Sequence, residues 1–284
     1  MNKRYKKYFG LNSLILAVIL LIGLASFYYL YHRIRTQKEL YVSVSLLKPR
    51  ELIFNAPLNW LPFWIAKSVA VGDREVSPLG AVNAQVIQKD TYDSVSTIGN
   101  VSGQFVYLLL KMNAIRDRSG IYLFKNKPLS IGSVIDLKLS STNAQGLVTG
   151  VFDKLPKYEY KKMTVVLKGK QLDSSLVANI KAGQSIPYKD ALPLVKILTV
   201  NISGSSTSEL RSESVSGRPI LAFDQTKKDV DLTAEILVKK IDADYYYTEQ
   251  QKVKVGEWLQ LPFSEVTLSL PISSIIKIED IDLF

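Results

Sequence analysis

Short segments in which apolar and polar residues alternate occupy most of the chain after residue 39. An apolar residue at every second position places one face of a strand against a core. The clearest of these segments are Leu40–Leu47, Phe105–Met112, Met163–Leu167 and Val230–Val238. The pattern predicts a mainly β protein.

The order of these segments recurs, so the second half of the chain repeats the first. Two pairs of segments align without gaps: Ile121–Leu137 with Tyr245–Leu261, and Ile65–Ile87 with Leu176–Leu198. Glycines match within them: Gly132 with Gly256, and Gly72 with Gly183. A glycine at such a place indicates a tight turn or the end of a short helix, where a Cβ would be strained. We interpret the matches as an internal duplication with different insertions, at 48–64 in the first copy and 203–218 in the second.

The predicted fold is a transmembrane helix followed by two tandem, related β-modules, each a barrel or a sandwich with one short helix. Residues 1–38 are expected to form a cytoplasmic stub and the transmembrane helix, residues 39–155 the first module and residues 156–284 the second. Each module, at about 120 residues, is long enough to bury a core without disulfides. The chain has no cysteine to form one.

The transmembrane prediction rests on Tyr8–Tyr31, a nearly apolar segment without charge. About 20 apolar residues span a bilayer as a helix. Lysines and arginines flank the segment and favour a cytoplasmic N-terminus. We therefore expect an uncleaved signal anchor in the inner membrane, with the C-terminal modules outside. A cleaved signal peptide, cut near Gly23-Leu24-Ala25, is the alternative.

The net charge of +10 is concentrated at the N-terminus. Residues 1–38 hold seven Lys and Arg and no acid, whereas the remaining 29 Lys and Arg face 26 Asp and Glu, a net of +3. A basic segment beside a membrane helix is typical of contact with anionic lipid. Nucleic-acid binding needs a basic stripe on a folded domain, so we expect no nucleic-acid partner.

Catalytic equipment is scarce in this sequence. The only histidine is His32, and without cysteine neither a Ser-His-Asp triad, a Cys-His pair nor a usual zinc site is available in the modules. Nucleotide-binding glycine motifs are absent. We predict no catalytic, cofactor-binding or metal-binding residues, and a protein that is not an enzyme. A hydrolase that uses Asp73 and Glu75, or a Ser-Lys pair, is a weaker alternative.

Two groups of aromatic residues are the candidate contact sites. Trp60, Phe63 and Trp64 lie in the first-copy insertion, and Tyr245, Tyr246 and Tyr247 follow one another in a predicted strand. The first group is either core or a patch that touches a membrane or a partner. In the second group, alternation exposes at least one ring, which suits protein contact or sugar stacking. Near the C-terminus, the acids Glu279, Asp280 and Asp282 are interpreted as a solvated tail.

The segment Val71-Gly72-Asp73-Arg74-Glu75, followed by Gly80, Ala84 and Val86, resembles a bacterial family of membrane-anchored envelope proteins of unknown function. That resemblance implies one N-terminal helix followed by extracytoplasmic β-domains, and it supplies no active site. The chain also bears a partial likeness to periplasmic adaptor proteins. A helical hairpin of 30 or more residues, which those adaptors contain, is missing after Arg35.

The function expected from the sequence is a non-enzymatic structural or assembly subunit of an extracytoplasmic complex. Its partners would be the lipid bilayer together with other envelope proteins or further copies of itself. Two alternatives remain: a binding module for cell-wall glycan or another surface polymer, and an adaptor subunit of an export system.

Overall fold

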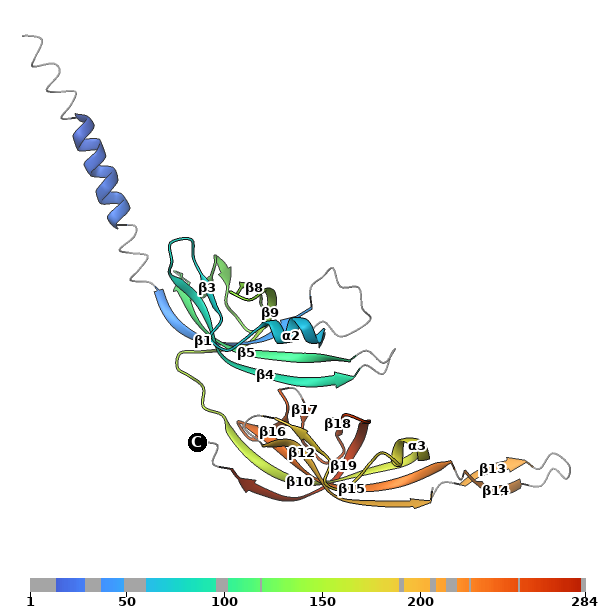
Figure 1. The fold of residues 1–284 in the computed structure, drawn as a ribbon. Helices are drawn as coiled ribbons and strands as arrows, with labels where there is room; N and C mark the ends of the chain where they lie inside the picture. Colours follow the sequence, from blue (N-terminus) through green and yellow to red (C-terminus); the bar gives the residue numbers. More distant parts are fainter. Residues whose placement is uncertain are drawn as a thin grey trace, which may run out of the picture. The chain divides into compact units, whose positions relative to one another are not determined.

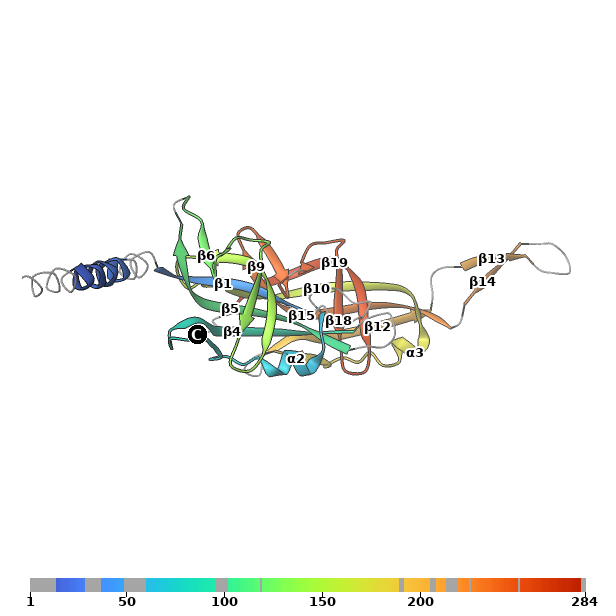
Figure 2. The same cartoon turned by 90° about the horizontal axis from the view of Figure 1, so that it is seen from above.

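The structure is a computed structural model that describes residues 14–28, 37–48, 60–95, 102–117, 119–188, 192–204, 208–212, 219–224, 226–249 and 251–281. Within these residues the chain is mainly β, in two curled sheets that resemble half-barrels (Figures 1 and 2). The chain divides into two compact units. We call them unit 1, residues 1–91 and 104–156, and unit 2, residues 92–103 and 157–284.

The predicted transmembrane helix is wrong. The described part of the N-terminal segment is a helix over residues 14–28, which at about 1.5 Å per residue is shorter than a hydrocarbon core of about 30 Å. Among the residues that the structure describes, none belongs to a helix long and apolar enough to span a membrane. The predicted single-pass location in the inner membrane is overturned with it. His32 lies outside the described residues.

Unit 1 is an antiparallel sheet with the strand order β3-β4-β5-β1-β9-β8, and β2 and the hairpin β6–β7 pair off this path. Alternate residues of the central strand β1 are fully buried, which is the period-two pattern of the sequence. The elements are β1 Gln37–Leu47, β2 Trp60–Leu61, α2 Phe63–Ser68, β3 Arg74–Val76, β4 Val82–Val95, β5 Ser102–Arg116, β6 Tyr122–Phe124, β7 Lys127–Pro128, β8 Val134–Lys138 and β9 Asn143–Phe152.

Unit 2 has the strand order β11-β12-β15-β10-β19-β18, with the hairpin β16–β17 attached to β15. The elements are β10 Glu159–Asp173, α3 Ser174–Val177, β11 Ser185–Pro187, β12 Pro193–Gly204, β13 Ser208–Ser212, β14 Pro219–Phe223, β15 Lys227–Ile241, β16 Asp244–Tyr247, β17 Gln251–Lys252, β18 Trp258–Pro262 and β19 Thr267–Asp280. The acids Glu279 and Asp280 belong to β19 and not to a tail, and their side chains are 41% and 82% exposed; Asp282 lies outside the described residues.

The two units share one topology. The nine elements β1, α2, β3, β4, β5, β6–β7, β8 and β9 recur in the same order as β10, α3, β11, β12, β15, β16–β17, β18 and β19, and the order of strands across the sheet is the same. The differences are additions at the predicted insertion 48–64 and, in unit 2, at the predicted insertion 203–218 and the five residues after it. Unit 1 adds β2, and unit 2 adds the hairpin β13–β14 between β12 and β15.

One glycine turn is built in the same way four times. The φ angles of Gly72, Gly132, Gly183 and Gly256 are +93°, +85°, +88° and +93°. Their N–H groups donate to Val86, Val148, Ile197 and Ile272, at 2.9, 2.8, 2.9 and 2.8 Å. Each of these strand residues donates its own N–H back to the residue after the glycine. The sequence paired these glycines only between the copies, whereas the hydrogen bonds show that each unit also contains two similar halves.

The residues three before and three after each glycine point into the core. Those before it are Val69, Leu129, Ile180 and Val253, and those after it are Glu75, Ile135, Ile186 and Leu259; all eight are buried. Seven of them are aliphatic, as a core position requires. Glu75 is the exception, and a buried carboxylate needs partners that the other three turns do not supply.

Candidate functional site

The first candidate is an exposed aromatic pair, Phe63 and Trp64, at the start of α2. Their side chains are 51% and 55% exposed, and their rings meet edge to face with centroids 5.3 Å apart. Lys67 Nζ lies 5.6 Å from the Phe63 centroid, within range of a cation–π contact. Two large rings that stay half in solvent on a folded domain are available to another molecule.

A lysine of β4 holds the C-terminal end of α2 in place. Lys89 Nζ donates to the carbonyl oxygens of Ala66 and Val69, at 2.7 Å each. These carbonyls lie at the C-terminal end of the helix, where a cation is favourable. Burial lowers the pKa of Lys89, and the charge of Asp73 opposes that shift. The aromatic pair is thus presented by a helix that is tied to the sheet.

The third aromatic residue of this group is separated from the other two. Trp60 is buried in β2, where it pairs with Phe105 of β5. In unit 2 the positions of the aromatic pair belong to Ser174 and Ser175, both exposed at the start of α3. The same fold is therefore formed with serines in place of Phe63 and Trp64.

The tyrosine run of β16 offers less surface than the sequence suggested. Tyr247 is 1% exposed, and Tyr245 and Tyr246 are half-buried. The Tyr247 hydroxyl has no hydrogen-bond partner among the described residues. Burial raises the pKa of Tyr247, because ionisation would place a charge in the core.

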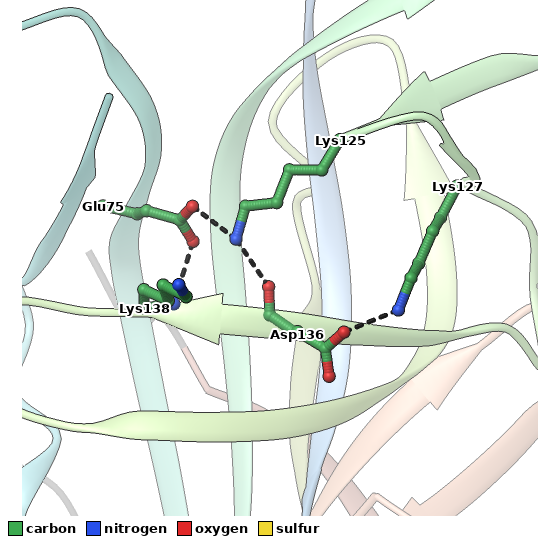
Figure 3. A network of polar contacts seen from close by, with 5 residues as sticks. All are labelled: Glu75, Lys125, Lys127, Asp136 and Lys138. Atoms are coloured by element: carbon green, nitrogen blue, oxygen red, sulfur yellow. Dashed lines mark hydrogen bonds and ion pairs between the residues drawn. The ribbon is translucent and has the colours of Figure 1, made fainter. Parts of the chain in front are cut away.

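The second candidate is the polar cluster around Glu75 (Figure 3). Glu75 Oε1 pairs with Lys125 Nζ, from the β6–β7 turn, and Glu75 Oε2 accepts the backbone N–H of Lys138 at 2.9 Å. Lys125 also donates to the Asp136 carbonyl at 2.8 Å, and Lys127 pairs with the Asp136 carboxylate at 2.6 Å. We call these five residues the Glu75 cluster.

The Glu75 cluster lies where the two ends of the sheet meet. Strand β3 is the first in the strand order and β8 the last, yet the N–H of Lys138 on β8 is satisfied by Glu75 on β3. Beside this hydrogen bond, the backbone N–H of Ser140 donates to the carbonyl oxygen of Arg74 at 2.9 Å. These bonds connect β3 to the β8 end, and we call this junction the seam of unit 1.

Two carboxylates beside Glu75 are also fully engaged. Asp73 accepts hydrogen bonds from Ser140, Ser141 and the N–H of Ala70. Desolvation opposes ionisation of Asp73, but these hydrogen bonds outweigh it and lower its pKa. The hydrogen bond from Lys127, followed by that from Gln145, lowers the pKa of Asp136.

The geometry of the Glu75 cluster suits a structural role, in which it holds β3 to the β8 end of the sheet, better than it suits acid–base catalysis. Each oxygen of Glu75 has a partner within unit 1 and the residue is 3% exposed, so the carboxylate is out of reach of a substrate in solvent. Asp73 is held ionised by its donors. Within the described ranges there is no group of three or more His, Cys, Asp or Glu side chains placed to hold a metal ion.

At the aligned positions, unit 2 has neither member of the Glu75–Lys138 hydrogen bond. The alignment places Ile186 where unit 1 has Glu75, and Pro262, which has no N–H, where unit 1 has Lys138. The acceptor and the donor are replaced together, so neither is left buried and unpaired. Glu75 was a candidate residue from the sequence, but Lys125, Asp136 and Lys138 were not; the double mismatch with Ile186 and Pro262 was the signal that could have found them.

The tip of the β6–β7 hairpin is also anchored differently in the two units. The alignment places Glu249 of unit 2 where unit 1 has Lys125. Both oxygens of Glu249 accept from Lys239 Nζ, at 2.8 and 2.9 Å, and Lys239 lies 3.3 Å from the Tyr158 ring centroid. Each hairpin is thus fixed by an ion pair, in which the hairpin supplies the cation in unit 1 and the anion in unit 2.

Comparison with family models, with curated proteins and with solved structures found no match for this chain. The resemblance to envelope proteins drawn from the sequence stays an expectation.

Proposed function

We propose that the protein is a non-enzymatic assembly subunit that binds a partner protein through Phe63 and Trp64. The observation that carries this proposal is the contrast between the copies: unit 2 forms the same fold with Ser174 and Ser175 at the same positions. The aromatic pair is therefore unnecessary for folding. A feature that the fold does not need, and that exposes two rings to water, is best explained by a bound partner.

Rings as large as those of Phe63 and Trp64 can supply much of the binding energy of an interface. Aromatic side chains, tryptophan above all, are enriched among the few residues that carry most of the binding energy, and removing one typically costs about 2 kcal/mol or more. Lys67 adds a cation beside the rings. The partner surface expected is an apolar pocket with an acidic or polar rim.

The absence of an enzymatic role in this proposal is supported by the state of the polar groups. Glu75, Asp73 and Asp136 each bind donors of their own unit. Residues so engaged hold strands together and are poor proton carriers. The sequence adds that one histidine and no cysteine are available in the chain.

The experiment is photo-crosslinking from position 64 in the native host. A photoreactive phenylalanine analogue replaces Trp64, and captured molecules are identified by mass spectrometry. The enriched partner is then purified and its Kd measured against the unmodified chain and against the double variant Phe63→Ser/Trp64→Ser. The two serines are the residues of unit 2, so the fold is expected to be kept. We expect a loss of affinity of at least about 30-fold, which corresponds to about 2 kcal/mol.

The matched control is Leu79→Ser, which removes an exposed apolar side chain of the same unit outside α2. It is expected to leave the Kd unchanged. Equal Kd values for the double variant and the unmodified chain would refute the proposal. Capture of a polysaccharide instead of a protein, lost in the double variant, would favour the alternative of a polymer-binding module, since sugars also stack on tryptophan.

A further inference from the structure

The last strand of unit 2 is longer than its counterpart in unit 1. The strands β9 and β19 begin at matching positions, but they have 10 and 14 residues. The four additional residues are Lys277, Ile278, Glu279 and Asp280, and they pair on one side with Lys161–Thr164 of β10. The extension is thus a regular ladder with a strand on its inner side.

The outer side of this extension carries no strand among the described residues. Strand β18 pairs with β19 only up to Pro271, and the Gly256 turn reaches Ile272. Two register shifts follow, which leave Ser273 and Ile276 without partners in β10. The side chains of Ile276 and Ile278 are 61% and 42% exposed. An open edge with exposed isoleucines is a place where another strand can pair.

The sequence of the extension is complementary to itself in antiparallel register. When Ile278 lies opposite Ile278 of a second copy, Lys277 lies opposite Glu279 and Glu279 opposite Lys277. Cross-strand partners share a face of the sheet, so both opposite-charge pairs are in contact. Lys277 and Glu279 already pair within the strand, and the hydrogen bond from Lys277 lowers the pKa of Glu279. Both charges are therefore present at neutral pH, on the face opposite that of Ile278.

We propose that two copies of this chain pair through residues 276–280 of β19, antiparallel and about a two-fold axis centred on Ile278. The pairing continues the β10–β19 ladder of one copy into that of the other and covers Ile278, and it places Ile276 of each copy opposite Asp280 of the other. A two-fold axis makes the contact closed, because each copy supplies the same patch. This inference rests on the proposed role as an assembly subunit, to which it adds a self-association surface separate from Phe63 and Trp64.

The test is the mass of the purified full chain by sedimentation velocity, from about 1 to about 100 µM, the range expected for a small interface. The unmodified chain is expected to shift from monomer to dimer across this range. Lys277→Glu places Glu opposite Glu twice, and Glu279→Lys places Lys opposite Lys twice. Each single variant is expected to weaken dimerisation at least about tenfold, because like charges directly opposite are destabilising.

Two further measurements make the register itself testable. The double variant Lys277→Glu/Glu279→Lys exchanges the charges, and it is expected to dimerise like the unmodified chain. A one-to-one mixture of the two single variants is expected to form a heterodimer, because one chain then carries an acid at both positions and the other a lysine at both. The control is Lys252→Glu, which breaks the exposed pair with Asp244 away from this edge and is expected to leave the dimer intact.

Monomer at every concentration would overturn the inference, and so would a dimer that the single variants leave unchanged. Circular dichroism and melting temperature are recorded for every variant, so that loss of the dimer is separated from loss of the fold. A chain that stays monomeric yet still binds its crosslinked partner through Phe63 and Trp64 would refute the dimer and leave the proposed function standing.

Discussion

Units 1 and 2 share one strand order but have different residues at the two ends of the sheet. At the seam of unit 1, a buried carboxylate of Glu75 accepts the N–H of Lys138 and pairs with Lys125. At the matching positions unit 2 has Ile186 and Pro262. Both solutions leave no buried polar group unsatisfied at these positions, so the fold accepts either a complete polar cluster or none.

The neighbouring residue shows which part of this chemistry is common. Asp73 in unit 1 and Gln184 in unit 2 both accept the N–H three residues earlier in the chain, from Ala70 at 2.8 Å and from Lys181 at 2.9 Å. Asp73 also accepts a hydrogen bond from Ser140 across the seam. The turn is thus shared between the units, whereas the polar seam is a feature of unit 1.

The largest effect is expected when a carboxylate is placed in unit 2 at the position aligned with Glu75. Ile186→Glu buries a charge in a unit where Pro262, which has no N–H, is aligned with the donor Lys138, and we expect it to destabilise unit 2 by about 3 kcal/mol or more. Hydrogen exchange resolved by unit measures the effect, with unit 1 as the internal control. Unchanged protection of unit 2 would show that this position accepts a carboxylate without the donor that unit 1 supplies.

The converse change removes the carboxylate from unit 1. Glu75→Ile leaves the N–H of Lys138 unpaired, and we expect a loss of about 2 to 3 kcal/mol in urea unfolding, somewhat below the usual figure for a buried pair because Lys125 is partly exposed. Adding Lys138→Pro removes the orphaned donor and copies unit 2. The double variant is therefore expected to be at least about 1 kcal/mol more stable than the sum of the single effects. Strict additivity would show that the two residues do not act together.

The shared turns are expected to respond equally. In Gly72→Ala and in Gly183→Ala the new Cβ has no atom within 4 Å, so only the positive φ angle of the glycine opposes the change. We expect each to cost about 1 to 2 kcal/mol in its own unit, measured by thermal unfolding. A large difference between the two values would mean that the turns are not equivalent.

The seam of unit 1 is expected to weaken in acid through Asp73. Because the pKa of Asp73 is lowered by folding, its contribution is present above its ordinary value of 3.8 and is lost as the pH falls through the folded value. The stability difference between the unmodified chain and Asp73→Asn should therefore shrink below about pH 4. Gln184→Asn in unit 2, which adds no titrating group, serves as the comparison and should show no such dependence.

The smallest effect is expected in the core of unit 2. The alignment places Tyr247 at the position of Leu123, and its hydroxyl is buried without a partner among the described residues. Tyr247→Phe removes that hydroxyl and should leave stability unchanged or raise it by up to about 1 kcal/mol. A marked loss of stability in calorimetry would reveal a hydrogen bond to this hydroxyl.

Much of the fold could be predicted from local pattern. Alternation in Leu40–Leu47 and Met163–Leu167 marked the central strands β1 and β10, and spacing alone located the four matched glycines, which have positive φ angles. The membrane helix was wrong, because no helix among the described residues is long and apolar enough to cross a membrane. Phe63, Trp64 and Trp60 were taken as one group because they are adjacent in sequence, whereas only the packing of β2 and α2 separates the buried ring from the exposed ones.

The sequence by itself determined the strand period, the duplication signal and the turn positions, because each depends on residues a few positions apart. Tertiary structure alone decided that Glu75 meets Lys138, 63 positions away, and that the end of β19 has no outer neighbour among the described strands. Those outcomes depend on which strands become neighbours across a curled sheet. A buried carboxylate is stable only where that neighbour offers a donor, and no local pattern records which neighbour it will be.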